Sequence, residues 1–464
     1  MESHNNLALL TDLYQLTMAQ SYFQNRKFEA ATFSLFIRSY PPNRGFFISA
    51  GLKDVLDFLQ NFAFGPDDID YLRSTKIFTD EFLDFLKGLR FTGEVWAIPE
   101  GRPFFKDEPI LEVTAPIIEA QIVETFIINQ INLQTLIATK AARCVYAAQG
   151  KSVVDFSLRR THGMDAGMKV ARASYLAGFD ATSNVLAGKR YGIPGVGTMA
   201  HSFILSFEHE IDAFRGFVAS FPENSTLLID TYDTLAGARK AVEIAREMAA
   251  DGKRLRGVRI DSGDLAALAR EVRKILDEAG FAEVKIVGSG GIDEYELEQL
   301  SEANAPYDSY GVGTKMGVSG DAPWFDIAYK IVEHNGRSVL KLSTGKVSWP
   351  GKKQAFRFLD RRGYLGRDVI ALRDEALPGG EPLLKNVMQG GKLREPSPTL
   401  KEIKGSFLEE FARLDKKIKA IRNPAIYPVE LSPQLNALKE EMEKEVTCAE
   451  VSPSVSAARG LGES

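Results

Sequence analysis

The feature that most constrains the fold is a repeat that begins near residue 150. Short apolar runs alternate there with helical patterns, and each run ends in a polar or glycine-containing turn. The runs are KSVVDFS, STLLID, LRGVRID, VKIVGSG and YDSYGVG, and the helical patterns LAGARKAVEIAREMAADG and DLAALAREVRKILDEAG lie among them. The middle three runs start about 30 residues apart, which is the length of a strand, helix, strand unit. Repetition of that unit predicts a buried parallel sheet.

The number of units points to the kind of parallel sheet. About seven are visible when the less certain ones near Phe179 and Val196 are counted, and this number favours a closed (β/α) barrel over an open doubly wound sheet. The residues before 100 differ, because TDLYQLTMAQSYF has a helical pattern while ATFSLFIRSY and GEVWAIP are typical of strands. The predicted fold class is therefore α/β, with a barrel-like domain and a separate α+β domain.

This organisation predicts three regions along the chain. Residues 1–115 form an N-terminal α+β region, and residues 116–345 form the α/β barrel, which is the catalytic domain. Residues 346–464 form a C-terminal region that packs on the N-terminal domain, so that the α+β domain is built from both. The tail VSPSVSAARGLGES is expected to be disordered.

Charge and cysteine content exclude several classes of protein. The formal net charge of -5 argues against a nucleic-acid partner held by a basic surface. The two cysteines, Cys144 and Cys448, are too few for a disulfide framework or a zinc site. No apolar stretch reaches the length of a membrane span, and MESHNNLALLTD is not built like a signal peptide. We therefore expect a cytoplasmic protein without a membrane or nucleic-acid partner.

Polar residues and glycines follow every apolar run. In parallel α/β folds, ligands bind at the carboxyl ends of the strands, so these residues are the first candidates for a site. They are Arg159, Arg160, Thr198, His201, Asp230, Tyr232, Asp233, Asp261, Ser262, Asp264, Gly288, Gly290, Gly291, Gly311, Gly313, Thr314 and Lys315. Together they offer donors for phosphate and carboxylates for sugar hydroxyls or magnesium, which suggests a phosphorylated sugar. Neither a Walker sequence nor a dinucleotide G-x-G-x-x-G motif is present.

Two side chains in this set need an explanation. His201 could simply cap the start of a helix, but its position near Asp230 and Asp261 at a barrel mouth favours a functional role. Arg259 lies inside an apolar strand run, where a charge is costly unless it meets an anion or a carboxylate.

Six motifs in order resemble one enzyme family. They are TDLYQLTMA at 11–19, FSLRR at 156–160, GTMAHS at 197–202, DTYDT at 230–234, GVRIDSGDL at 257–265 and GVGTKM at 311–316. In this order they resemble the nicotinate phosphoribosyltransferases, which belong to the type II phosphoribosyltransferases, and YPVELSP at 427–433 resembles the family's C-terminal region.

The resemblance implies an activity and its partners. The enzyme would join nicotinate to 5-phosphoribosyl 1-diphosphate and release diphosphate and nicotinate mononucleotide, in NAD salvage. ATP would phosphorylate the histidine matching His201, and Mg2+ would neutralise the leaving diphosphate. The family also implies a homodimer whose active sites are shared between subunits.

The resemblance further implies a role for each matching residue. Tyr14 and Phe156 would sandwich the pyridine ring, while Thr198 and Arg259 would contact the carboxylate of nicotinate. Asp230 would orient His201, and Asp261 would bind the ribose hydroxyls, which makes these three the catalytic set. The residues implied for phosphoribosyl diphosphate are Arg38, from a second subunit, Arg159, Gly288, Gly290, Gly291, Gly311, Gly313 and Thr314.

Three alternatives stay open from the sequence alone. Nicotinamide phosphoribosyltransferase shares the fold and the histidine, but it carries an aspartate near the ring where TSNVLAG offers Ser183 or Asn184. An anion there would repel nicotinate, so its absence favours the acid as substrate. Quinolinate would need a denser cationic pocket, and a catalytically silent barrel would be expected to lack His201 or the phosphate-site residues.

Overall fold

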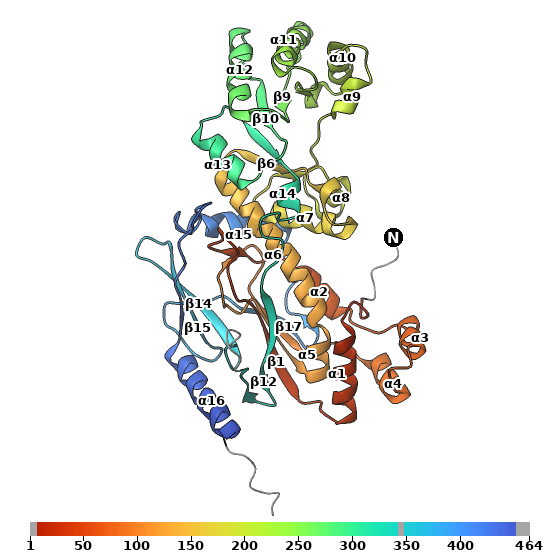
Figure 1. Cartoon of the computed structure of the whole chain (residues 1–464), viewed down its shortest axis with the longest axis vertical. Coiled ribbons are helices and arrows are strands. Elements are labelled where there is room, and N and C mark those ends of the chain that lie inside the picture. The colour runs from red at the N-terminus through yellow and green to blue at the C-terminus, as the bar shows by residue number, and fades with distance from the viewer. Residues whose placement is uncertain (1–6, 342–347, 452–464) are drawn as a thin grey trace, which may run out of the picture.

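The computed structural model describes residues 7–341 and 348–451, and these form two lobes stacked along the long axis of the molecule (Figure 1). The upper lobe contains a parallel sheet and the lower lobe an antiparallel one. The tail that was predicted to be disordered, residues 452–464, lies outside the described residues. Among the described helices none is both long and apolar enough to cross a membrane.

The parallel sheet confirms the strand, helix, strand repeat. Its six strands are β7 (Ala181–Thr182), β6 (Ser152–Asp155), β11 (Ser309–Val312), β10 (Lys285–Gly288), β9 (Gly257–Ile260) and β8 (Thr226–Leu228), in that spatial order. All of the neighbouring pairs are parallel, as for Lys285 beside Gly257 and Ser309 beside Ser152. Their carboxyl ends therefore meet along one edge.

Three helices of the upper lobe begin at aspartates that follow the strands. Asp233, Asp264 and Asp293 are the N-caps of α11 (Thr234–Ala250), α12 (Leu265–Glu278) and α13 (Glu294–Glu302), and each side chain accepts a hydrogen bond from a backbone N–H of the first turn. The apolar faces of these helices pack on the sheet in one core with Val258, Ile260 and Ile286. The other upper helices are α7 (Met164–Leu176), α8 (Val185–Tyr191), α9 (His201–Leu205), α10 (Glu210–Ser220) and α14 (Thr314–Gly317), with the 3-10 turns η1 (Leu158–Arg160) and η2 (Pro222–Asn224).

The predicted closed barrel is not found among the described residues. Beyond β7 the ladder continues only as a single bridge between Thr182 and Gly195, and no pairing connects this bridge to β8. The segment YGIPGVG explains the difference, because Pro194 lacks an N–H donor and Gly195 and Gly197 favour no strand. The sheet is therefore open between residues 195 and 226, and α9 and α10 lie along that stretch of chain.

The lower lobe is built on a seven-stranded sheet. Its order is β13 (Arg337–Ser338), β12 (Ile327–His334), β1 (Ala30–Ile37), β5 (Leu111–Pro116), β3 (Glu94–Ala97), β17 (Lys385–Gln389) and β18 (Lys392–Leu393). The predicted boundary at residue 345 is wrong for β12, because this strand pairs antiparallel with β1. Its apolar residues complete the lower core, where Tyr329 stacks on Phe33 with ring centroids 4.9 Å apart.

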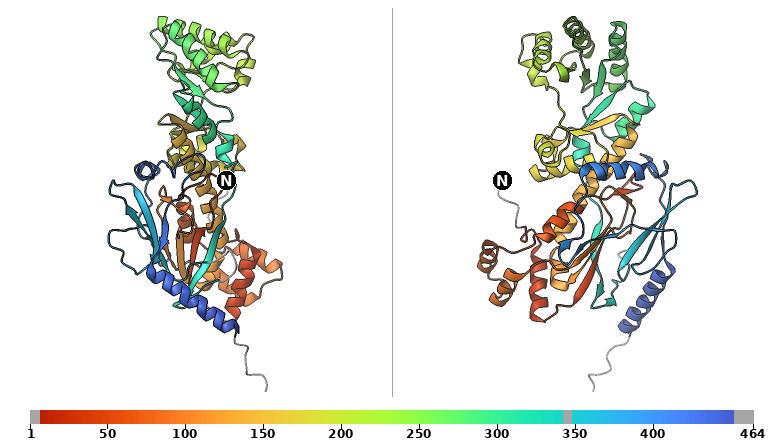
Figure 2. Two further views of the ribbon diagram at one scale, coloured as in Figure 1. Left: turned by 60° about the vertical axis from the view of Figure 1, so that its left-hand side comes forward. Right: turned by 180° about the vertical axis from the view of Figure 1, so that it is seen from behind.

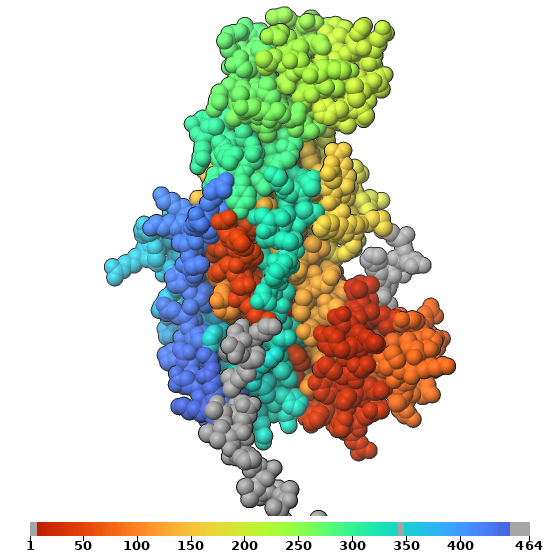
Figure 3. All heavy atoms as spheres, in the orientation of Figure 1, coloured from red at the N-terminus to blue at the C-terminus, as the bar shows by residue number. Residues whose placement is uncertain are grey.

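The remaining elements surround this sheet and join it to the upper lobe. A four-stranded sheet is made of β16 (Glu381–Pro382), β14 (Lys353–Leu359), β15 (Leu365–Leu372) and β19 (Val429–Leu431), and β2 (Phe47–Ile48) pairs with β4 (Pro103–Phe104). The helices are α1 (Leu13–Gln24), α2 (Leu52–Gln60), α3 (Pro66–Ser74), α4 (Asp80–Gly88), α5 (Ile117–Ile122), α6 (Glu124–Ala147), α15 (Leu400–Ala412) and α16 (Pro433–Val451). The long α6 runs from one lobe into the other, as the two further views show (Figure 2). The space-filling view shows the upper lobe projecting above the broader lower lobe (Figure 3).

Candidate functional site

A cavity of about 520 Å³ lies at the carboxyl edge of the parallel sheet. It is lined by residues that follow β6, β7, β9, β10 and β11, together with the segment before α9. Those predicted site residues that line it are Phe156, Arg159, Thr198, Arg259, Asp261, Gly290, Gly291, Gly311, Gly313 and Thr314. Residues from five separate stretches of sequence are thus brought to one place.

Arg259 is the cation at the bottom of this cavity. Its Nη1 donates to Thr198 Oγ1 at 2.7 Å and to the Met199 carbonyl at 3.3 Å, and its Nη2 lies 3.6 Å from Asp261 Oδ1. Burial lowers the pKa of this guanidinium, although Asp261 and Asp230 oppose the shift. The Nε is buried and has no hydrogen-bond partner among the described residues. A buried guanidinium with an unused donor is suited to an anionic ligand.

His201 is the first residue of α9, and its side chain is 40% exposed. Its Nδ1 lies 3.1 Å from Thr231 Oγ1, and its Nε2 lies 3.9 Å from Asp261 Oδ2. The hydrogen bond to Thr231 restricts the ring orientation while the other nitrogen stays open to a ligand. The alternative role, a histidine that caps the helix, is not supported, because the N-cap residue is Ala200 and the His201 ring bonds to the Thr231 side chain.

The resemblance implies that Asp230 orients His201. The structure instead shows Asp230 bonded to other groups. Its Oδ2 accepts hydrogen bonds from the Asp261 N–H at 2.9 Å and from Ser262 Oγ at 2.6 Å. Asp230 therefore shapes the turn that carries Asp261, and the hydrogen-bond partner of His201 is Thr231. The reason is that Asp230 and Thr231 are consecutive, and only the folded turn determines which of them faces the ring.

Serine and glycine residues hold Asp261 from the other side. Ser289 Oγ donates to Asp261 Oδ1 at 2.6 Å. Gly290 has a φ of +87°, and a Cβ there would stand 1.6 Å from the Asp261 carbonyl oxygen, so only glycine fits. Gly288 differs from the other predicted glycines, since it is buried in β10 beside the Tyr307 ring and does not line the cavity.

Three further residues at the site had no assigned role, although Ser289 belongs to a predicted strand-end turn and Ser183 was one of two alternatives near the ring. Thr231 and Ser289 bond to His201 and Asp261, and Ser183 lines the cavity. Each of these three residues directly follows or precedes a strand-end residue, and this position in the sequence could have identified them as site residues. Asn184, the other sequence alternative to Ser183, is buried and caps α8 by accepting from the Ala187 N–H.

Five residues to which the resemblance gave roles do not line this cavity, namely His201, Asp230, Gly288, Tyr14 and Arg38. His201 and Asp230 lie beside the cavity residue Asp261, whereas Tyr14 and Arg38 lie far from it. Tyr14 is on α1 in the lower lobe, 50% exposed, and Arg38 follows β1 and pairs with Asp326 at 3.4 Å. Neither lines the cavity, and α1 and β1 stand well below the upper lobe (Figure 1). Within one chain, Tyr14 and Arg38 therefore lie apart from the predicted site residues that line the cavity.

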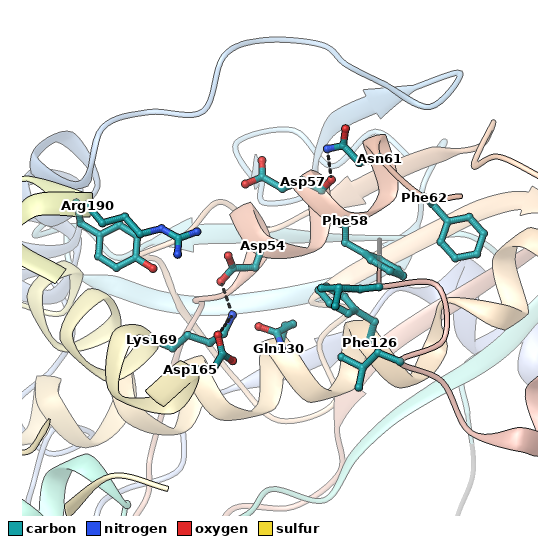
Figure 4. A pocket seen from close by; sticks show the side chains of 13 residues that line it. Asp54, Asp57, Phe58, Asn61, Phe62, Phe126, Gln130, Asp165, Lys169 and Arg190 are labelled. Atoms are coloured by element: carbon teal, nitrogen blue, oxygen red, sulfur yellow. Dashed lines mark hydrogen bonds and ion pairs between the residues drawn. The ribbon is translucent and has the colours of Figure 1, made fainter. Parts of the chain in front are cut away.

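A second cavity of about 470 Å³ opens between α2, α6, α7 and α8 (Figure 4). Lys169 lies there 3.3 Å from Asp54, and the ring of Phe58 stacks on that of Phe126 with centroids 3.8 Å apart. It contains none of the predicted site residues.

Comparison with known proteins gives consistent matches over nearly the whole chain. Three family models match: the nicotinate phosphoribosyltransferase N-terminal domain at residues 9–132, the nicotinate phosphoribosyltransferase family at 151–347 and the C-terminal domain at 379–439. The chain is 46% identical over 432 residues to nicotinate phosphoribosyltransferase pncB2 of Mycobacterium tuberculosis, with 92% of each chain covered. It is 36% identical to the nicotinate phosphoribosyltransferase of Bacillus subtilis, covering 92% of this chain and 93% of that one.

The fold is also similar to solved structures. Human nicotinic acid phosphoribosyltransferase superposes with a TM-score of 0.84 at 31% identity, over 93% of this chain and 99% of that one. A nicotinate-nucleotide pyrophosphorylase from Pyrococcus furiosus superposes with a TM-score of 0.73 at 26% identity, over 89% and 97% of the two chains.

Proposed function

The chain belongs to the nicotinate phosphoribosyltransferase family, and we propose that it forms nicotinate mononucleotide and diphosphate from nicotinate and 5-phosphoribosyl 1-diphosphate, in NAD salvage. The observation that carries this proposal is Arg259, whose guanidinium is 13% exposed and lines a cavity at the carboxyl edge of the sheet. A pyridine carboxylate satisfies such a donor set.

The lining of the cavity favours nicotinate over the alternatives. Phe156 offers an aromatic face for the pyridine ring, and Thr198 is already aligned with Arg259 by their hydrogen bond. Ser183 is neutral, so this position does not repel a carboxylate as an aspartate would. A catalytically silent protein is disfavoured because His201, Asp261 and Thr314 are all present.

The remaining lining residues fit phosphoribosyl diphosphate. Gly290 and Gly291 after β10, and Gly313 and Thr314 after β11, offer backbone N–H groups to phosphate, with Arg159 as a cation and Asp261 as an acceptor for ribose hydroxyls. The pyridine nitrogen would form a bond to C1 of the ribose while the bond from C1 to the diphosphate oxygen breaks. Diphosphate then leaves with that electron pair.

We assign the coupling to ATP to His201. An imidazole nitrogen would attack the γ-phosphorus, a nitrogen–phosphorus bond would form and ADP would leave. Water would later cleave this phosphohistidine to inorganic phosphate. Thr231 would hold the ring during both steps, since it is the hydrogen-bond partner that the fold provides.

Mg2+ is the cofactor that this chemistry requires. No group of three metal-ligating side chains is found among the described residues, but Mg2+ is commonly held by one or two carboxylates and substrate phosphates. Asp230 and Asp261 fit that role, because Asp230 Oδ1 is buried without a hydrogen-bond partner and Asp261 lines the cavity. When bound, the metal supplies positive charge that stabilises the leaving diphosphate.

We propose a homodimer in which Tyr14 and Arg38 of one subunit complete the cavity of the other. Exposed apolar side chains support this, because Val185 follows the cavity residue Ser183 and is 83% exposed, and Leu205 at the end of α9 is 60% exposed. Leu13 beside Tyr14 is 54% exposed. Apolar surface at a cavity mouth and around a predicted ring contact is typical of a surface covered on association. We also propose a cytoplasmic location, which the small number of cysteines supports.

Mixed dimers test the shared site. Arg38→Ala and His201→Ala chains are each expected to lack ATP-stimulated product formation, because each lacks one contribution to the shared site. Mixing them by reversible unfolding or co-expression is expected to restore activity, since a hybrid dimer contains one intact site. A hybrid without activity would contradict shared sites, and self-mixed controls of each variant establish the background.

The proposed activity itself is tested by product formation. Phosphoribosyl diphosphate is supplied with nicotinate, nicotinamide or quinolinate, each with and without ATP and Mg2+, and the mononucleotide is measured. We expect product from nicotinate, increased by ATP. Product from nicotinamide or quinolinate instead would assign a related transferase, and no product from any of them would favour the silent protein.

A further inference from the structure

Asp155, the last residue of β6, is a buried carboxylate that no predicted role uses. It is 1% exposed. Its Oδ1 accepts from the Ser157 N–H at 2.9 Å and from Ser157 Oγ at 2.5 Å, and its Oδ2 accepts from Thr182 Oγ1 at 2.7 Å. Both oxygens are therefore engaged, and by donors from two different strand ends.

Burying this carboxylate is unfavourable by itself. Burial raises the pKa of Asp155, and the hydrogen bonds from Ser157 and Thr182 act in the opposite direction. A neutral or apolar residue would avoid the desolvation cost. A carboxylate at position 155 is therefore explained if its hydrogen bonds to Ser157 and Thr182 fix the backbone geometry of the site.

The two strand ends that Asp155 connects both carry cavity residues. Phe156 and Arg159 follow on one side, and Ser183 follows Thr182 on the other. The backbone reinforces the link, because the Ser183 N–H donates to the Asp155 carbonyl at 2.9 Å.

Close packing against Gly311 and Gly317 also fixes the turn at Phe156 and Ser157. A Cβ at Gly311 would stand 2.4 Å from the Phe156 ring, and a Cβ at Gly317 would stand 2.4 Å from Ser157 Cβ. The absence of both Cβ atoms lets the turn lie directly on β11 and α14. Packing on β11 and α14 limits movement of the turn at 156–157 toward the sheet. The Asp155 hydrogen bonds limit movement of this turn parallel to the sheet.

We propose that Asp155 is a positioning residue, whose carboxylate holds the Phe156 turn and the Ser183 turn in one fixed arrangement and so preforms the binding site for the pyridine ring. The inference rests on the proposed function for the identity of the ligand, but the arrangement of the two turns can be measured without any ligand. Thr182 is the second positioning residue, since its hydroxyl donates the hydrogen bond to Asp155 that joins the two turns.

Thr182→Val is the primary test, because it keeps the side-chain shape and removes the hydroxyl, which donates to Asp155 and accepts from the Asn184 N–H at 3.1 Å. We expect the KM and the Kd for nicotinate to rise about tenfold, the effect of losing a hydrogen bond to a charged group, while kcat changes much less. Thr182→Ser keeps the hydroxyl and is expected to bind nicotinate like the parent enzyme. Asp155→Asn should also weaken nicotinate binding. If Asp155→Asn folds poorly, the milder Thr182→Val variant still tests the proposal.

The matched control is Ser152→Ala, at the opposite end of β6. Ser152 Oγ donates to Asp180 Oδ2 at 2.7 Å, so this variant also removes a hydroxyl-to-carboxylate bond on the same strand. It is expected to leave nicotinate binding unchanged.

Hydrogen exchange of the ligand-free enzyme separates this inference from the proposed function. Peptides covering residues 156–160 and 183–184 should exchange faster in Thr182→Val and at the parent rate in Thr182→Ser and Ser152→Ala. Parent-like exchange and an unchanged nicotinate Kd in Thr182→Val would overturn the positioning role. Failure of the parent enzyme to bind nicotinate, with exchange altered as expected, would overturn only the proposed function.

Discussion

His201→Ala is expected to abolish the stimulation of mononucleotide formation by ATP. Alanine offers no nitrogen to accept the γ-phosphoryl group, so phosphorylation and its coupling to the transfer step are lost together. ATP hydrolysis should fall at least about a hundredfold, as expected when a positioned nucleophile or base is removed. Because His201 is not among the residues that line the cavity, the substitution leaves the lining unchanged and slow ATP-independent product formation should persist.

The measurement follows both ATP hydrolysis and mononucleotide formation under steady-state conditions. Mass spectrometry at alkaline pH after incubation with ATP and Mg2+ locates the phosphate on the parent chain. His209→Ala is the matched control, since His209 is exposed at the start of the next helix and makes no side-chain cap bond. Phosphate found on another residue, or ATP stimulation that survives in His201→Ala, would remove His201 from this role.

Arg259→Ala has the second largest expected effect. It removes the buried guanidinium whose Nη1 bonds to Thr198 and whose Nε is unused. Loss of a desolvated charge that pairs with the nicotinate carboxylate should raise the KM for nicotinate about a hundredfold. The KM for phosphoribosyl diphosphate should change much less, because its proposed contacts come from other turns. Arg259→Lys should recover only part of the affinity, since an ammonium group cannot provide two parallel donors.

Binding of nicotinate and of nicotinamide, each measured directly, tests this recognition. The neutral amide lacks the carboxylate, so its weaker binding should be affected less by the substitution than that of the acid. Arg256→Ala is the control from the other end of the same strand, where Arg256 pairs with Glu223 at 2.6 Å on the surface. An equal loss for acid and amide in Arg259→Ala would indicate general damage to the cavity and contradict recognition of the carboxylate.

Much of the cavity was predictable from the repeat in the sequence. Parallel strands with helical crossovers place their carboxyl ends at one edge, so Arg159, Asp261 and Thr314 could be grouped before any coordinates were known. The helix starts at Asp233, Asp264 and Asp293 are equally local, because a carboxylate at an N-cap needs only the next few residues.

Other features depended on contacts between distant segments. The closed barrel was not found because Pro194 and its neighbouring glycines end the pairing at Gly195, and β12 belongs to the lower sheet because its partner is β1. The partner of His201 is Thr231, which no periodicity distinguishes from Asp230.

The sequence by itself determined the alternation of strands and helices, the family and the set of polar groups at the strand ends, because each depends on residue types at short spacing. Only the tertiary structure decided which of these groups touch. The bonds from Asp155 to Thr182 and from Asp230 to Ser262 join segments about 30 residues apart, and their geometry follows from how neighbouring strands register. It also decided that Tyr14 and Arg38 stand apart from the cavity within one chain, because α1 and β1 belong to the lower lobe and the cavity lies at the sheet of the upper lobe.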